Sequence, residues 1–155
     1  MHFLQTNGPI FNGGIVVIRG HGHANIVNNT IMMGPGGSDI FPVGIFFGGH
    51  AEARYMISGN TITTDNPSAD GMDGVAFDSS DPTHAALITN NHIVMQSLIP
   101  TSGGIALVGA MDSSTVSSNT IEGTNGNAIQ ILGLDGATLR IRTGHWATIS
   151  HTIPH

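Results

Sequence analysis

The chain contains no cysteine and no lysine, and both absences restrict what it can do. Without cysteine there is no disulfide framework, no thiol nucleophile and no cysteine-ligated zinc site. Four arginines and nine histidines are the basic residues, and ten acidic residues give a net charge of −6 with histidine neutral. Nucleic acids and anionic membranes bind clustered lysine and arginine, so we expect neither as a partner.

Long apolar segments are lacking too. No hydrophobic run approaches the roughly 18 residues that a membrane-crossing helix needs, and Met1-His2-Phe3-Leu4 lacks the features of a signal peptide. Charged residues make up only 9% of the 155 residues, whereas glycine occurs 22 times. The length predicts one domain, large enough to bury a continuous core.

What the chain does contain is a repeat. A six-residue pattern occurs four times: an aliphatic residue, two further residues, Asn, a polar residue and Ile. Its Asn stands at positions 29, 60, 91 and 119, which are 31, 31 and 28 residues apart. A second signal runs in step with the first: Gly14-Ile15, Gly44-Ile45, Gly74-Val75, Gly104-Ile105 and Ala128-Ile129. Repeats of 20 to 50 residues are typical of solenoids, so the sequence predicts a solenoid of about five coils.

Each repeat is expected to form three short strands, whose alternating residues stack into columns when coils stack. We expect four inward columns, because no single coil can bury these side chains alone. The columns are Ile15, Ile45, Val75, Ile105 and Ile129; Val17, Phe47, Phe77, Leu107 and Ile131; Ile26, Ile57, Ile88 and Val116; and Ile31, Ile62, Ile93 and Ile121.

The four repeated asparagines fall at one corner of the predicted coil. Stacked Asn amides bond to each other and to turn backbone, and Asn tolerates the left-handed conformation that such a corner requires. Buried polar groups must be satisfied, so we assign these residues a structural role and no chemistry.

The Ile-x-x-Asn-Thr-Ile pattern with a following Gly-Ile resembles the repeat of right-handed, pectin-lyase-like parallel β-helices, over about residues 12 to 132. The resemblance implies an all-β, right-handed parallel β-helix with an Asn ladder. Residues 1–12 would belong to a partial N-terminal coil, and residues 137–155 to an irregular C-terminal cap or oligomerisation segment. The family includes carbohydrate lyases, hydrolases and epimerases as well as phage tailspikes and adhesins, which favours an extracellular or periplasmic location.

In that family the Gly-Ile strands form the first sheet, whose outer face usually carries the substrate groove. Its outward residues here are expected to be small or apolar, with Asp78 as the one charge. A contiguous apolar strip is typical of a partner surface, so we expect a homo-oligomer, with a trimer favoured; sugar stacking on Phe46 is the alternative. The outward residues are Gly14, Val16, Ile18, Gly44, Phe46, Gly48, Gly74, Ala76, Asp78, Gly104, Ala106, Val108, Gln130 and Leu132.

Two sets of turns flank this face. One set aligns histidines with acidic and basic residues across successive coils: Arg19, His21 and His23; His50, Glu52 and Arg54; Asp78, Asp81 and His84; and Asp112. Histidine beside carboxylates can act as general acid, general base or metal ligand, although polar turns are also common without chemistry. The other set carries Asp39, Asp65, Asp70 and Asp73, which could bind Ca²⁺ or another divalent metal, supply the two carboxylates of glycoside hydrolysis, or simply form turns.

Three fragments resemble polygalacturonase-type glycoside hydrolases: Gly20-His21-Gly22, Asp70-Gly71-Met72-Asp73 and Arg140-Ile141-Arg142-Thr143. The resemblance implies that Asp70 or Asp73 is catalytic, that His21 assists, and that Arg140 and Arg142 bind a uronate carboxylate. The order differs from the family, since His21 precedes the acids, and the adjacent Asp-Asp pair is missing. A pectate-lyase mechanism would instead need Ca²⁺ and a Lys or Arg base, for which Arg19 and Arg54 are the nearest residues.

The sequence thus favours a carbohydrate-active enzyme on a polysaccharide or oligosaccharide, with glycoside hydrolysis ahead of elimination and no metal site assigned. The alternative is a non-catalytic, homotrimeric binding or structural module of the tailspike or adhesin type. The catalytic candidates are His21, His50, Asp70, Asp73, Asp78 and Asp81; the substrate-binding candidates are Arg19, His23, Phe46, Arg54, His84, Arg140 and Arg142.

Overall fold

A computed structural model describes residues 2–3, 12–18, 22–33, 42–48, 53–65, 73–79, 85–96, 103–109, 114–124, 126–132, 140–142 and 149–152 of the chain. These ranges contain strands and short turns and no helix. Accordingly, no helix in the described ranges is long and apolar enough to cross a membrane.

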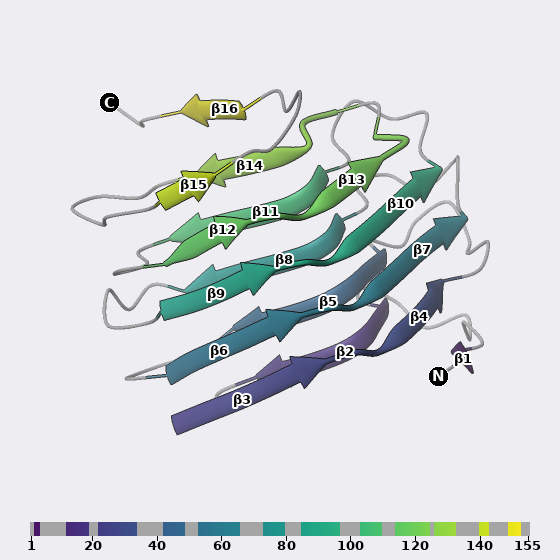
Figure 1. The fold of residues 1–155 in the computed structure, drawn as a ribbon, viewed down its shortest axis with the longest axis horizontal. Coiled ribbons are helices and arrows are strands. Elements are labelled where there is room, and N and C mark those ends of the chain that lie inside the picture. The colour runs from purple at the N-terminus through teal and green to yellow at the C-terminus, as the bar shows by residue number, and fades with distance from the viewer. Residues whose placement is uncertain are drawn as a thin grey trace.

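The strands form three parallel sheets (Figure 1). The first sheet contains β2 (Asn12–Ile18), β5 (Pro42–Gly48), β8 (Asp73–Ser79), β11 (Gly103–Gly109), β14 (Ile129–Leu132) and β16 (Ile149–Thr152). The second contains β3 (Gly22–Val27), β6 (Ala53–Ser58), β9 (Ala85–Thr89), β12 (Thr115–Ser117) and β15 (Arg140–Arg142). The third contains β1 (His2–Phe3), β4 (Thr30–Met33), β7 (Thr61–Asp65), β10 (His92–Gln96) and β13 (Thr120–Glu122).

Each repeat contributes one strand to each sheet, in the order first, second, third, and pairs with the same strand of the next repeat. In Figure 1 the second and third sheets face the viewer and the first sheet lies behind them. This arrangement is all-β and compatible with a parallel β-helix, as the repeat predicts.

The four predicted columns pair in register. Ile45 pairs with Val75, Ile57 with Ile88, and Ile62 with Ile93, and nearly every column member belongs to a single core cluster between the sheets or packs against it. At the centre of this core the Phe47 ring stacks on Tyr55 of the second sheet with centroids 5.1 Å apart. The described sheets are thus held together by burial of the predicted aliphatic and aromatic side chains.

The asparagine ladder runs along the corner between the second and third sheets, as predicted. The backbone N–H and the side-chain Nδ2 of Asn60 both donate to Oδ1 of Asn91, at 3.0 and 2.9 Å. Asn29 donates to Asn60 in the same way, and Asn91 to Asn119. Asn60, Asn91 and Asn119 also donate to a main-chain carbonyl of the preceding repeat, such as Asn91 Nδ2 to the Ile57 oxygen at 3.0 Å, whereas Asn29 Nδ2 donates to the Val27 oxygen of its own repeat. Asn60 and Asn91 are only 1% exposed, so the ladder satisfies buried polar groups.

The left-handed residue of the corner is not the ladder asparagine, which corrects the expectation from the sequence. It is the residue before it: Asn28, Gly59, Asn90 and Ser118 have φ angles of 56°, 67°, 55° and 55°. Asn and Gly adopt this region at low cost, which accounts for three of the four residues. The ladder asparagine itself is therefore selected for its amide and not for its backbone.

The repeated glycines of the first sheet do not face outward, contrary to the prediction. A Cβ atom on Gly74 would meet Cγ2 of Ile93 in the third sheet and lie 2.7 Å from the carbonyl oxygen of Gly104. Gly14, Gly44 and Gly104 have the same surroundings. The pairing between neighbouring strands skips these glycines: Val43 pairs with Asp73 and Ile45 with Val75. Glycine is required here because the backbone approaches both the core and the next repeat.

The outer face of the first sheet is not an open apolar strip over its whole length. Ala76 and Ala106 are 7% and 5% exposed, and with the fully buried Val43 they form a small second cluster against which Phe46 packs. Val16 remains 41% exposed at the edge strand β2. The side chains of Ile18, Gly48, Asp78 and Leu132 lie outside those that the structure describes.

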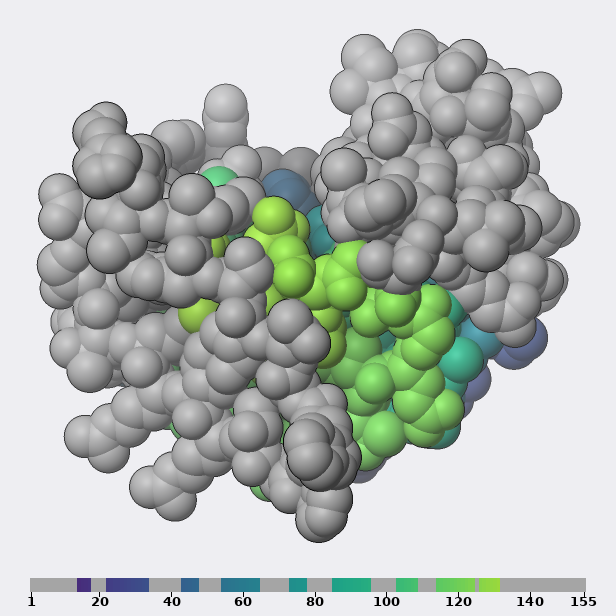
Figure 2. Space-filling model, turned by 90° about the horizontal axis from the view of Figure 1, so that it is seen from above, coloured from purple at the N-terminus to yellow at the C-terminus, as the bar shows by residue number. Residues whose placement is uncertain are grey.

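The two ends of the repeat array carry extra strands. At the N-terminal end β1 pairs with β4 and extends the third sheet. At the C-terminal end β15 pairs with β12 and β16 pairs with β14, so both strands extend existing sheets. Figure 2 looks onto this end, where the described parts of β12, β13 and β14 are visible in green.

Candidate functional site

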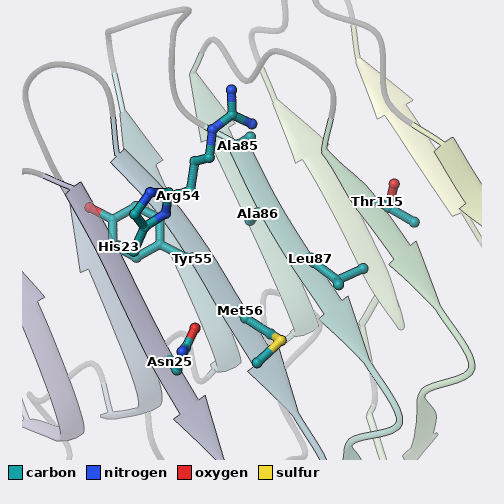
Figure 3. A pocket seen from close by; sticks show the side chains of 9 residues that line it. All are labelled: His23, Asn25, Arg54, Tyr55, Met56, Ala85, Ala86, Leu87 and Thr115. Atoms are coloured by element: carbon teal, nitrogen blue, oxygen red, sulfur yellow. The ribbon is translucent and has the colours of Figure 1, made fainter.

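A pocket of about 250 Å³ opens on the outer face of the second sheet (Figure 3). It crosses four strands, β3, β6, β9 and β12. Its lining consists of His23, Asn25, Arg54, Tyr55, Met56, Ala85, Ala86, Leu87 and Thr115. A pocket with apolar walls and a few convergent polar groups is the usual form of a small-molecule site.

Strand alternation produces this lining. In β6 the residues Tyr55 and Ile57 point into the core, so Arg54 and Met56 project outward. The register then places His23 beside Arg54, and Arg54 beside Ala85, in one outward column. The second outward column pairs Asn25 with Met56, Met56 with Leu87, and Leu87 with Thr115. Tyr55 and Ala86 form the floor between the two columns.

The pocket carries positive charge without a matching acid. Arg54 and His23 are exposed and lie on adjacent strands. None of the described lining residues is acidic, and no carboxylate in the described part of the chain lies within ion-pair distance of the Arg54 guanidinium. The described lining can therefore bind an anionic or polar ligand, but it holds no carboxylate for acid–base catalysis.

Two of the substrate-binding residues predicted from the sequence are thus brought together. His23 and Arg54 were expected in turns, but both lie within strands, β3 and β6. Phe46 does not join them: it lies on the first sheet, half-buried against the cluster of Val43, Ala76 and Ala106. A single site containing Arg54, His23 and Phe46 is therefore not formed.

Asp73 is the predicted catalytic residue whose side chain the structure describes. It begins β8, pairs with Val43 and Gly103, and is 4% exposed. Burial raises the pKa of its carboxyl to about 7, against a weaker lowering effect of the Gly103 backbone hydrogen bond. Among the described residues, none supplies a hydrogen bond to its Oδ1 atom. Asp73 can hold a proton near neutral pH, but it does not line the pocket.

The other predicted site residues cannot be placed. Asp78 lies in β8, and Arg140 and Arg142 lie in β15, but their side chains are outside those described. The remaining candidates fall outside the described residues: Arg19, His21, His50, Asp70, Asp81 and His84.

Apart from His23 and Arg54, the lining residues were not among the predicted site residues; those that project outward include Asn25, Met56, Leu87 and Thr115. The signal for them was present, because alternation already placed Ile57 and Ile88 inward and hence Met56 and Leu87 outward. The prediction considered the outer face of the first sheet alone, because the resembling family uses that face.

The described residues include no group of three or more His, Asp or Glu side chains that could hold a metal ion. A single pair, His92 Nε2 and Glu122 Oε1, lies 3.3 Å apart on the exposed face of the third sheet. Two such ligands alone fall short of the sets that bind zinc or calcium.

Comparison of the chain with protein-family models, with curated proteins and with solved structures yields no match.

Proposed function

We propose that the chain is a short right-handed parallel β-helix that acts on a polysaccharide, with its ligand on the outer face of the second sheet. The solenoid is supported by three parallel sheets, one strand per repeat in each, and by the asparagine ladder that joins the repeats. The location of the ligand is supported by the pocket across β3, β6, β9 and β12.

The observation that carries this proposal is the direction of the pocket. It runs across parallel strands, which are about 4.8 Å apart, so its outward side chains recur along the solenoid axis. An extended saccharide chain that follows the axis would meet one side chain of each column per repeat. Polar groups beside the half-buried Met56 and the exposed Leu87 suit a ring with both hydroxyls and an apolar face.

The catalytic groups would come from the turns that precede the lining strands in the sequence. His21 comes directly before β3, His50 precedes β6, and Asp81 and His84 precede β9. The first or second described residues of these strands, His23, Arg54 and Ala85, line the pocket. In this proposal His21, His50 and Asp81 supply acid–base chemistry, by hydrolysis ahead of elimination, while Arg54 and His23 bind substrate.

A second candidate is a non-catalytic carbohydrate-binding module that acts as a homo-oligomer, with a trimer favoured. The observation that favours it is the absence of a carboxylate from the described lining of the pocket. The two candidates share the ligand-binding face and differ only in whether the preceding turns perform chemistry.

The test is an assay on uronate-containing and neutral polysaccharides that follows reducing ends and the absorbance of an unsaturated product, with Ca²⁺ and with chelator. New reducing ends alone show hydrolysis, and added absorbance shows elimination. His50→Ala and Asp81→Asn should then lower kcat at least tenfold, whereas His92→Gln, on the third sheet, should leave it unchanged.

Retention on an immobilised polysaccharide without any product, by a protein that sediments as a trimer, would support the binding module instead. A protein that neither cleaves nor binds any polysaccharide of the panel would overturn both candidates.

A further inference from the structure

We propose that the pocket on the second sheet selects an anionic saccharide, whose carboxylate or sulfate binds Arg54 while a sugar ring lies on Met56 and Leu87. This inference rests on the proposed function, which supplies the saccharide, and adds the charge and the orientation of the ligand. It concerns residues of the second sheet only.

The anion site follows from an exposed arginine that has no acidic partner among the described residues. Arg54 is exposed, and within the described residues no carboxylate neutralises it. His23 stands beside it on β3, and Asn25 lies two residues further along that strand. A guanidinium presents paired N–H donors that match the two oxygens of a carboxylate or sulfate, and such charge-assisted bonds are roughly twice as strong as neutral ones.

The net charge of the chain is opposite in sign to the charge of the pocket lining. Ten acidic residues against four arginines make the protein acidic, yet the described lining of the pocket contains an arginine and a histidine and no acid. A basic spot on an acidic protein favours an anionic ligand there by charge complementarity.

The other end of the pocket is apolar. Leu87 is 41% exposed, and Met56 and Ala85 stand next to it in the two outward columns. In Figure 3 the Arg54 side chain extends beside Ala85, and the Met56 and Leu87 side chains project from the same face of the sheet. The apolar face of a sugar ring can cover these side chains while the acidic group of that ring, or of its neighbour, contacts Arg54.

Neighbouring strands are about 4.8 Å apart, so Arg54 on β6 and Leu87 on β9 are one repeat apart along the axis. We therefore place the anion towards β3 and β6, at Arg54, and the apolar ring face on Met56 of β6 and Leu87 of β9. Thr115 on β12, which pairs with Leu87, can bond a hydroxyl beyond the ring.

The experiment measures binding of defined oligosaccharides by isothermal titration calorimetry with the full chain. The probes are a tetrasaccharide of galacturonate, its methyl ester, a sulfated tetrasaccharide of galactose and its unsulfated form. We expect at least one acidic probe to bind about tenfold more tightly than its neutral partner at low salt, and this advantage to shrink in high salt.

Two variants test the anion site and the apolar surface of the pocket separately. Arg54→Gln should remove the advantage of the acidic probe and leave the neutral partner unchanged. Leu87→Asn should weaken acidic and neutral probes alike, by about tenfold. His92→Gln is the matched control on another sheet and should bind as wild type does. Both Arg54 and Leu87 are exposed, so unchanged melting temperatures are expected and exclude misfolding as the cause of a loss.

The outcomes distinguish the inference about the anion from the proposed polysaccharide function. An advantage for the uronate alone, for the sulfate alone or for both, abolished by Arg54→Gln, supports the inference and identifies the anion. Equal binding of acidic and neutral probes, or an advantage that survives Arg54→Gln, overturns the inference but leaves polysaccharide binding intact. Absence of binding by every probe, together with inactivity on the polysaccharide panel, overturns the proposed function itself.

Discussion

Replacement of Asn91 by alanine tests how much the asparagine ladder contributes to stability. Asn91, like Asn60, makes four side-chain hydrogen bonds in the ladder: its Oδ1 accepts from the N–H and the Nδ2 of Asn60, and its Nδ2 donates to the Ile57 oxygen and to Asn119. Alanine removes all of these side-chain bonds, so the buried N–H of Asn60 loses its acceptor and the Ile57 oxygen loses the Asn91 donor, while Asn60 Nδ2 keeps its bond to the Ile26 oxygen.

The magnitude follows from those orphaned groups. Two donors of Asn60 lose their acceptor and the carbonyl of Ile57 loses its donor, at sites that are essentially inaccessible to water. At about 1 kcal/mol for each lost bond, and more where a buried group stays unsatisfied, Asn91→Ala should lower the free energy of unfolding by roughly 3–5 kcal/mol. For a chain of this length that corresponds to a melting temperature lower by about 6–20 °C.

Asn29→Ala is the matched control, because it removes the same amide from the first position of the ladder. Asn60 Oδ1 keeps the backbone N–H of Asn29 as a donor, and the second lost bond, to the Val27 oxygen, is exposed. We expect a loss of about 1 kcal/mol. Urea unfolding followed by circular dichroism measures both variants, and equal losses in the two would refute the proposed role of buried amide pairing.

Three further predictions concern the first sheet and the corner. Above pH 4 the unfolded chain releases the Asp73 proton that the folded chain keeps up to about pH 7, so stability should fall by roughly 4 kcal/mol between pH 4 and 7. Asp73→Asn should flatten this part of the urea-unfolding profile and exceed wild type in stability at pH 8; parallel profiles would contradict the assignment. Gly74→Ala should cost about 1–3 kcal/mol in urea unfolding, since its Cβ would overlap Ile93 and the next repeat. Ser118→Gly should stabilise by up to about 1 kcal/mol in the same assay, because φ is 55° at this position, and a loss would show that the serine hydroxyl is needed.

The stacking of the chain could be predicted from sequence because it depends on periodicity alone. Ile57, Ile88 and Val116 recur at the spacing of the asparagines, and the structure pairs them in one column. The same regularity predicted which amides would stack. Backbone conformation at the corner was misjudged, because a repeated Asn-Asn pair does not reveal which of its two residues is left-handed.

The glycine column shows why simple alternation failed in the first sheet. Alternation from Ile45 places Gly44 outward and Val43 inward, yet Val43 clusters with Phe46 on the outer side. The pairing between neighbouring strands skips the glycine. Gly44 and Ile45 therefore both lie on the inner side, and the in–out alternation is interrupted, as in strands that bend at an irregular position. Only a residue without a Cβ atom fits at this position. The cause is a contact with the third sheet, which the residue pattern of a single strand does not reveal.

The candidate site was predicted in part. His23 and Arg54 were chosen because basic and polar residues align across repeats, and the structure confirms that they are neighbours. The pocket on the second sheet depends on the sizes of side chains over four strands, including the small Ala85 and Ala86, and alternation does not indicate side-chain volume.

The uneven spacing of the ladder has a consequence for how such a chain can change over time. The step from Asn91 to Asn119 is 28 residues and the step from Asn60 to Asn91 is 31, yet the bonds formed are the same length, 2.9 and 3.0 Å. The repeat that ends at Asn119 is three residues shorter than the one before it, and the ladder keeps its register. Turns can therefore gain or lose residues while the sheets keep their phase, so the segments beside the pocket can diversify for new ligands without a redesign of the scaffold.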